Sequence, residues 1–252
     1  MPRYDFRSAR LFVDVPLAEG AAVPLEAAQA NYLLNVLRLK GGAAVLLFNG
    51  RDGEWRAEVA GTARKKVTLE IVERTRPQTA ARGLDYLFSP LKHARLDYMV
   101  QKAVEMGVSR LAPIIMRHTQ VERVNLDRMR ANAIEAAEQC GILSVAEVAE
   151  PKKFDSLIRG WKAERLLVFC DEEADVKDPV AALAPARGGG LAGPLPVSVL
   201  IGPEGGFADS ERAALLELPN AVRLALGPRI LRADTAAVAA LALVQAVLGD
   251  WR

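Results

Sequence analysis

The sequence predicts an α/β protein of two domains: a small β-rich domain, then a mostly parallel sheet with helices on both faces. In the first segment, Asn-Gly and Asp-Gly pairs separate short β-type runs, a pattern typical of hairpins. After residue 83, apolar strand-like runs alternate with helical patterns, and such alternation indicates a parallel sheet. Residues 75–83 lack an apolar period and are expected to form a linker. We therefore assign residues 1–76 to the first domain and residues 77–252 to the second.

The first domain is predicted to be a small β-barrel. Its β-type runs cover residues 10–13, 43–48, 54–59 and 66–72, and a helix is expected over residues 25–37. This pattern favours a barrel of the PUA or OB type, a class that commonly binds RNA. Residues 1–83 hold 13 Lys and Arg against 9 Asp and Glu, so this segment suits phosphate contacts. The alternative is an accessory barrel that only supports the second domain.

In the second domain, apolar runs typical of strands alternate with runs of helical periodicity. Strands are expected at residues 84–89, 111–115, 165–170, 197–201 and 222–226, and helices at 93–106, 126–140, 154–161, 209–217 and 235–248. The last helix is apolar on nearly all sides, which is typical of a buried helix or of a subunit interface. Its apolar stretch, residues 236–248, is too short to span a bilayer, so no membrane association is expected.

The amino-acid composition narrows the class of protein to which the chain can belong. The chain has 252 residues, 51% of them hydrophobic and 25% charged, which is ordinary for a globular protein. Its two cysteines, Cys140 and Cys170, are too few for a disulfide scaffold, and no basic-then-apolar leader opens the sequence. We expect a cytoplasmic protein. With only His93 and His118 and no clustered cysteines, the sequence offers no zinc ligand set, and no metal is expected.

Two Gly/Pro loops are the most informative motifs. The first, residues 201–207, reads Ile-Gly-Pro-Glu-Gly-Gly-Phe, and the second, residues 226–232, reads Leu-Gly-Pro-Arg-Ile-Leu-Arg. A lone Gly-Pro pair after a strand is most often only a turn. Here each loop follows a predicted strand, and ligands of open α/β sheets bind outside the carboxyl ends of strands. Because glycine lets a ligand approach the backbone closely, the pair predicts one pocket with a largely main-chain lining.

These loops, together with Glu211, closely resemble those of the RsmE-type ribosomal RNA methyltransferases of the SPOUT class. The resemblance spans nearly the whole chain and includes residues 10–13, 36–38, 102–113 and 135–141. It implies S-adenosylmethionine-dependent methylation of N3 of one uridine in small-subunit (16S) ribosomal RNA, without a metal. It also implies a trefoil knot in the C-terminal third that holds the methyl donor, a homodimer, and the assembled small subunit as the substrate particle.

The resemblance also implies the residues of the site. The donor would be held by residues of and beside the two loops, namely Leu200, Ile201, Gly202, Pro203, Glu204, Gly205, Gly206, Leu226, Gly227, Ile230, Leu231 and Thr235. Arg232 and Glu204 are the expected catalytic residues. RNA contacts are expected from Arg10, Arg38, Arg117 and Arg123; the last two flank a polar loop after a strand.

Uridine N3 carries a proton, so the enzyme must stabilise a developing anion on the uracil ring. Arg232 suits this role because a guanidinium stays charged and presents a fixed fork of donors. The alternative is an ion pair from Arg232 to Glu204 or Asp234 that only holds the loops. Glu204 itself either orders the first loop, accepts a hydrogen bond from the donor's amino group, or caps a helix. The sequence does not identify the group that accepts the N3 proton.

Three positions depart from the family pattern. Asp234 stands where the family usually has Glu, and it either reaches a base or caps the last helix; we favour the cap, for which Thr235 is the other candidate. Ala208 replaces a Ser or Thr that would form a capping box with Glu211, so the helix is expected to start at Asp209. Ile142 replaces an arginine, which removes one possible RNA contact.

Two other functions remain open at this point. The fold would equally suit a SPOUT enzyme that methylates another RNA position, such as a ribose 2′-OH or a transfer RNA base. A non-catalytic RNA-binding assembly factor is the second, although the intact glycines of both loops argue against a degraded pocket.

Overall fold

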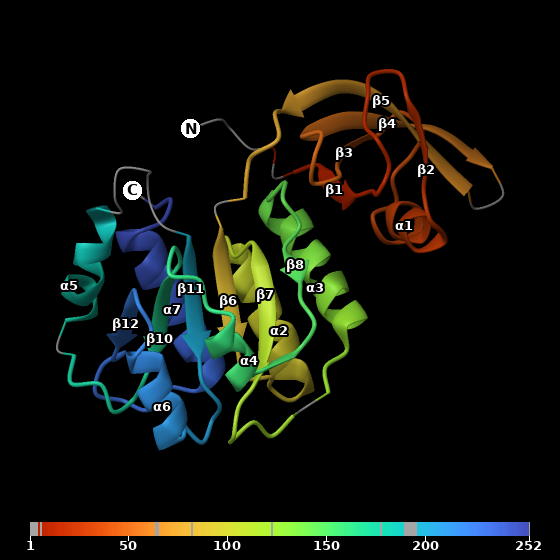
Figure 1. Ribbon diagram of the computed structural model, residues 1–252. Coiled ribbons are helices and arrows are strands. Elements are labelled where there is room, and N and C mark those ends of the chain that lie inside the picture. The colour runs from red at the N-terminus through yellow and green to blue at the C-terminus, as the bar shows by residue number, and fades with distance from the viewer. Residues whose placement is uncertain are drawn as a thin grey trace. The chain divides into compact units, whose positions relative to one another are not determined.

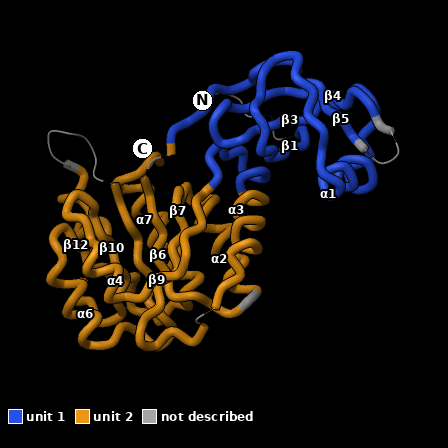
Figure 2. The backbone as a smooth tube through the Cα atoms, turned by 45° about the vertical axis from the view of Figure 1, so that its right-hand side comes forward, with its two compact units in different colours: residues 1–80, 137–145 blue, residues 81–136, 146–252 orange. Residues whose placement is uncertain are grey.

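The computed structural model describes residues 5, 7–63, 66–81, 83–121, 123–176, 178–188 and 196–251 (Figure 1). The chain forms two compact units (Figure 2). Unit 1 comprises Met1–Ala80 and Ala137–Val145, and unit 2 comprises Ala81–Ala136 and Ala146–Arg252. The sequence did not anticipate that residues 137–145 cluster with the first unit.

Unit 1 is built on a five-stranded sheet with the order β1-β3-β4-β5-β2. Its strands are β1 (Ala9–Phe12), β2 (Ala22–Pro24), β3 (Ala44–Phe48), β4 (Glu54–Ala63) and β5 (Lys66–Arg76). Strands β1 and β3 are parallel, whereas the other neighbours are antiparallel. The predicted helix is present as α1 (Ala27–Asn31) and a π-helical turn, η1 (Tyr32–Val36).

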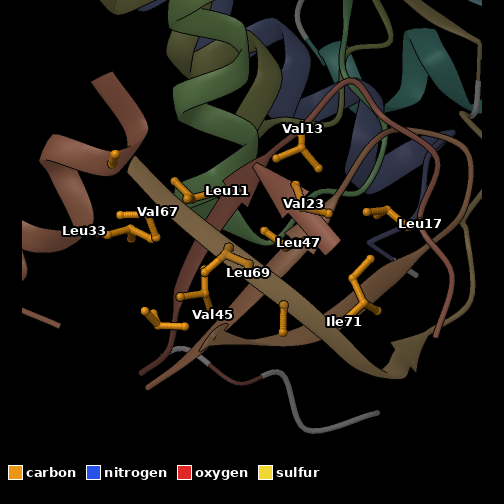
Figure 3. Packing of buried hydrophobic residues seen from close by; sticks show 13 residues of the cluster. Leu11, Val13, Leu17, Val23, Leu33, Val45, Leu47, Val67, Leu69 and Ile71 are labelled. Atoms are coloured by element: carbon orange, nitrogen blue, oxygen red, sulfur yellow. The ribbon is translucent and has the colours of Figure 1, made fainter. Parts of the chain in front are cut away.

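The core of unit 1 lies on one face of this sheet. Strand residues alternate between the two faces, so Val45, Leu47, Leu69 and Ile71 project into one cluster, which also contains Leu33 from η1 (Figure 3). All five side chains are buried. The period of two that predicted the strands therefore also selects the residues of this core.

Unit 2 contains a parallel sheet with the order β12-β10-β11-β6-β7-β8, and β9 pairs with β7. Its strands are β6 (Leu84–Phe88), β7 (Arg110–Ile115), β8 (Glu147–Val148), β9 (Lys152–Lys153), β10 (Leu166–Cys170), β11 (Val197–Ile201) and β12 (Ala221–Leu224). Its helices are α2 (His93–Glu105), α3 (Leu126–Cys140, which continues into unit 1), α4 (Phe154–Arg159), α5 (Pro179–Leu183), η2 (Ala184–Gly188, a 3-10 helix), α6 (Asp209–Leu216) and α7 (Ala233–Val247). The predicted α/β class with a parallel sheet is confirmed.

Helices cover both faces of this sheet (Figure 1). Helices α4 and α6 contact each other over one face, where Leu87, Phe169 and Leu200 form a buried cluster with Phe154 and Leu215. On the other face, α2 and α7 contact each other, and the buried Tyr86 hydroxyl lies 3.0 Å from the Met99 sulfur of α2. Because all strands between them are parallel, their carboxyl ends share one edge of the sheet.

The lengths and hydropathies of the helices show whether any of them could span a membrane. Within the part of the chain that the structure describes, no helix has the length and apolar character needed to cross a bilayer.

Candidate active site

Three loops enclose a cavity of about 690 Å³ at the carboxyl edge of the sheet in unit 2. They follow the neighbouring strands β10, β11 and β12, and they contribute residues 170–172, 201–207 and 225–233. The size lies within the range of about 300–1,000 Å³ that is common for small-molecule sites. The two Gly/Pro loops that the sequence singled out therefore form walls of a single cavity.

Glycine is required at several positions of these loops. Gly206 and Gly227 have φ angles of +73° and +91°, a region that other residues adopt only at a cost. A Cβ at Gly206 would also collide with the Glu172 carboxylate. At Gly202 a Cβ would lie 2.9 Å from the Phe207 ring. The first loop is thus folded tightly over its own phenylalanine, with main chain facing the cavity.

The carboxylate of Glu211, on α6, holds the end of the first loop by hydrogen bonds. It accepts hydrogen bonds from the Ala208 amide at 3.0 Å and from the Arg117 amide at 2.9 Å. Helix α6 begins at Asp209, as predicted, with Ala208 at the N-cap position. Only half of a capping box survives, because alanine has no side-chain oxygen. The bond to Arg117 joins the first loop to the loop after β7.

The end of β10 carries a buried carboxylate that the sequence analysis missed. Asp171 is 2% exposed and accepts hydrogen bonds from Arg212 at 2.9 Å and from Arg223 at 2.9 Å. Burial alone would raise the pKa of the Asp171 carboxyl, but hydrogen bonds from Arg212, Glu173 and Arg223 hold this pKa below its usual value. Asp171 is therefore a charged link between β10, α6 and β12 at the floor of the cavity.

Cys170 lines the same cavity. Burial, with a further contribution from the Asp171 charge, raises the pKa of its thiol to about 12. The thiol therefore stays protonated at neutral pH and is unsuited to nucleophilic chemistry. A signal for these missed residues existed, since the predicted strand at 165–170 places residues 170–172 at the same edge as the glycine loops.

Arg232 lines the cavity and is exposed. Among the described residues, its side chain forms no ion pair with Glu204 or Asp234. Glu204 instead pairs with Arg95 of α2, an interaction between residues 109 positions apart that the sequence does not reveal. The guanidinium of Arg232 is thus available to a ligand in the cavity.

Asp234 does not cap the last helix, contrary to the prediction. Helix α7 begins at Ala233 with Arg232 at the N-cap position, so Asp234 lies inside the first turn. Its carboxylate accepts a hydrogen bond from the Thr235 amide at 3.0 Å. A negative charge in a first turn still interacts favourably with the helix dipole.

Most residues expected to hold a donor lie around this cavity. Lining residues are Ile201, Gly202, Pro203, Glu204, Gly205, Gly206, Leu226, Gly227, Ile230 and Leu231. Leu200 instead has a fully buried side chain within the sheet core, and Thr235 lies on α7 outside the lining. The described residues contain no group of three or more His, Cys, Asp or Glu side chains placed to hold a metal ion.

The residues expected to contact RNA fall into two groups. Arg38, Arg117 and Arg123 are exposed. Arg10 is not: its side chain is 4% exposed and its Nε donates to the Glu54 carboxylate at 2.8 Å. The assignment of Arg10 to RNA is therefore withdrawn, because a buried, paired guanidinium has no access to a phosphate.

Comparisons with known proteins agree with this geometry. A family model described as an RNA methyltransferase domain matches residues 79–245, and one described as an RNA methyltransferase PUA domain matches residues 25–72. The fold and the cavity thus define an RNA methyltransferase with a PUA domain.

Curated relatives specify the family. The chain is 26% identical to ribosomal RNA small subunit methyltransferase E of Rickettsia conorii over 94% of each chain. It is 30% identical to the enzyme of that name from Synechocystis, over 90% of this chain and 74% of the relative. The chain belongs to the ribosomal RNA small subunit methyltransferase E family, as the two loops predicted.

A solved structure gives the same fold. The ribosomal RNA small subunit methyltransferase E from Neisseria gonorrhoeae, bound to S-adenosyl methionine, matches with a TM-score of 0.83. It is 25% identical, and the match covers 98% of this chain and 100% of that chain.

Proposed function

We propose that this protein transfers a methyl group from S-adenosylmethionine to N3 of a uridine in 16S ribosomal RNA. The observation that carries the proposal is the single cavity formed by the three loops after β10, β11 and β12. Its main-chain walls, with Gly206 and Gly227 in left-handed conformations, suit a nucleotide-sized ligand. The family relative from Neisseria gonorrhoeae binds S-adenosyl methionine, which supports this ligand.

The lining residues fit such a donor. Carbonyl and amide groups of the glycine loops would hold adenine, ribose and the methionine moiety, and the Glu172 carboxylate offers hydrogen-bond acceptors at the rim. When bound, the donor supplies an electrophilic methyl group on a sulfonium. The protein's part is to orient the acceptor and to exclude water, since direct displacement at carbon requires in-line geometry.

Arg232 is the proposed catalytic residue. Its exposed guanidinium lines the cavity and has no carboxylate partner among the described residues. A fixed positive charge at this place would stabilise the negative charge that develops on the uracil carbonyls when N3 loses its proton. Glu204 would act with it indirectly, through the ion pair that orders Arg95 at the cavity wall.

The proposed substrate is 16S rRNA within the assembled small subunit, and the proposed active form is a cytoplasmic homodimer. Exposed Arg38, Arg117 and Arg123 are suited to phosphate contacts. Helix α7 supports dimerisation, because it is apolar and Val238 and Leu243 remain only partly buried in the single chain.

The test is methylation by the purified protein of small subunits and of naked 16S rRNA, both from cells that lack the enzyme. Nucleosides would be identified by mass spectrometry against N3-methyluridine and ribose-methylated standards. We expect N3-methyluridine, formed faster on subunits. A methyl group on a ribose or on another base would contradict the proposed position. Calorimetry without detectable S-adenosylmethionine binding would indicate a non-catalytic assembly factor instead.

A further inference from the structure

A second cavity of about 260 Å³ adjoins the first at the same edge of the sheet. The two cavities share Arg95, Pro203 and Glu204, so one wall separates them. The second is lined by residues that follow β6 and β7, among them Lys92 and His118. Its volume is below the range common for drug-sized ligands, which suits a single base. Given the proposed function, this is where an RNA base would face the donor.

His118 connects the two cavities. It lines the second cavity, and its Nδ1 lies 3.1 Å from the carbonyl oxygen of Gly206 in the first loop. The imidazole can approach this closely because residue 205 is glycine: a Cβ there would lie only 3.2 Å from the His118 Cβ. The histidine therefore rests on the donor loop and faces the space beside it.

The loop that carries His118 is held at several points. The Thr119 hydroxyl accepts a hydrogen bond from the Met116 amide at 2.8 Å and lies 2.9 Å from the Ser89 hydroxyl. The Arg117 amide donates to Glu211 at 2.9 Å. These bonds tie the turn to β6 and to α6, so the imidazole is positioned before any substrate arrives.

The contact with Gly206 fixes the tautomer of His118. A carbonyl oxygen only accepts, so in the neutral imidazole Nδ1 must carry the hydrogen and Nε2 must carry the lone pair. Among the described residues Nε2 has no hydrogen-bond partner. The structure therefore leaves one basic nitrogen available in the cavity beside the donor loop.

We infer that His118 is the proton acceptor for the methylated uridine, and that the second cavity binds its uracil. This inference rests on the proposed function. Nε2 of His118 takes the proton from N3, and the N3 electron pair forms the new bond to carbon. The bound donor supplies that methyl carbon and keeps the electron pair of the broken carbon–sulfur bond as the neutral thioether. The imidazolium then releases its proton to water, which its exposed position permits.

The charges around the cavity favour this transfer. Lys92 lines it and is a cation that stabilises a uracil as it becomes an anion. The carboxylate of Glu204 is engaged by Arg95 in the structure, which leaves His118 as the better-placed acceptor. Positioned acid–base groups typically contribute about 100-fold or more to a rate.

The first test needs no catalysis. Nitrogen-15 NMR of the imidazoles in alkaline buffer reports which nitrogen carries the hydrogen, and the chain has only two histidines. The spectrum of His118→Gln assigns the signals of His118 by their loss. We expect the Nδ1–H tautomer. An Nε2–H tautomer would leave no lone pair in the cavity and would overturn the inference.

The second test separates proton transfer from positioning. His118→Asn keeps an N–H group near the Nδ1 position, and His118→Gln keeps a polar group near Nε2, but neither supplies a base. Subunits would be reconstituted with 16S rRNA that contains uridine or 5-fluorouridine, whose N3 hydrogen is more acidic. With uridine we expect kcat to fall by roughly 100-fold in both variants with little change in KM.

With 5-fluorouridine, part of the lost turnover should return in the variants, because a more acidic N3 needs less help from a base. An equal loss on both substrates would assign His118 to positioning only. The wild-type product distinguishes the two levels of inference. If its methyl group is not on uridine N3, the proposed function fails; if it is, and the variants turn over normally, the role of His118 alone fails.

Discussion

At the scale of single residues, a substitution of Arg232 is expected to change turnover much more than it changes the affinity for the methyl donor. The guanidinium of Arg232 is exposed at the donor cavity, which adjoins the cavity proposed to bind the uracil, and it is proposed to reach the uracil carbonyls from there rather than to hold the donor. We predict that Arg232→Ala lowers kcat by about 100-fold or more, the usual effect of removing one preorganised donor. The dissociation constant for S-adenosylmethionine, measured by calorimetry, should change by less than about tenfold, equivalent to 1.4 kcal/mol.

The matched control is Arg232→Lys. This variant keeps the charge but loses the fork of donors, so intermediate turnover is expected. Normal turnover in the alanine variant would refute the assignment. A large loss of donor affinity would mean instead that Arg232 holds the loops or the donor.

Arg10 and Arg38 have different surroundings in the folded chain. Arg10 is enclosed in unit 1, where Glu54 also accepts hydrogen bonds from Arg76 at 2.9 and 2.6 Å. Arg38 is exposed. Nothing in the local sequence distinguishes the two, because the partner of Arg10 is 44 residues away. This is why a prediction from sequence placed both on the RNA.

We predict opposite effects for the two arginines. Arg10→Ala should lower the free energy of unfolding by about 3 kcal/mol, because it breaks a buried ion pair. Arg38→Ala should leave stability nearly unchanged and reduce the slope of log affinity for RNA against log salt by about one. Urea unfolding and RNA binding at several salt concentrations check both. A stable Arg10→Ala protein with weakened RNA binding would show instead that Arg10 contacts the RNA.

At the scale of elements, Asp171 links three segments at the floor of the cavity. It follows β10 and receives hydrogen bonds from Arg212 of α6 and Arg223 of β12. Its side chain is fully buried, while Arg212 is 11% and Arg223 26% exposed. Asp171 therefore ties the end of β10 to the helix that follows the first loop and to the strand that precedes the second loop.

We predict that Asp171→Asn lowers the free energy of unfolding by about 3 kcal/mol at neutral pH. The folded state lowers the pKa of this carboxyl, so its contribution is fully present above the ordinary value of 3.8. It is lost as the pH falls below 3.8 and through the lower folded pKa. Urea unfolding of both proteins from pH 7 downward should show their difference shrinking only below about pH 4. A difference that is constant with pH would contradict a role for the charge.

Helices and strands in which apolar residues recur with a clear period were predictable from the sequence, whereas very short elements were not. The pattern over residues 126–140 predicts α3, and its bounds agree with the structure. Strands β8 and β9 have two residues each, too few for any period to register. The start of α7 was misplaced because Asp234 and Thr235 are both good capping residues, whereas the cap is the arginine before them.

Part of the site could be predicted from the sequence, namely its two loops, but the contacts between distant side chains could not. Glycine and proline favour particular backbone conformations and can be recognised in the local sequence, so both loops and their shared cavity were expected. Contacts between distant side chains carry no such signal. The pair of Arg95 with Glu204 and the bond of His118 to Gly206 join residues 109 and 88 positions apart. Only the folded chain reveals them.

At the scale of the whole molecule, α7 is the proposed subunit interface. Val238 and Leu243 are apolar and only partly buried in the single chain. We predict that light scattering at micromolar concentration gives twice the mass of one chain. Leu243→Asp should shift the molecule toward the monomer, whereas Leu216→Asp, at an exposed position of α6, should not. A monomeric mass for the wild type would count strongly against the dimer.

Residues 137–145 belong to unit 1 although residues 81–136 belong to unit 2. Within unit 1, Arg10 donates to the Glu138 carbonyl at 3.1 Å, and Arg76 donates to the Gly141 carbonyl at 2.9 Å. The polypeptide thus leaves unit 1 and later re-enters it. Cutting the gene after codon 76 would leave the first fragment without residues 137–145, which accept hydrogen bonds from its Arg10 and Arg76. A transplant of unit 1 into another protein would therefore need residues 137–145 as well as residues 1–80.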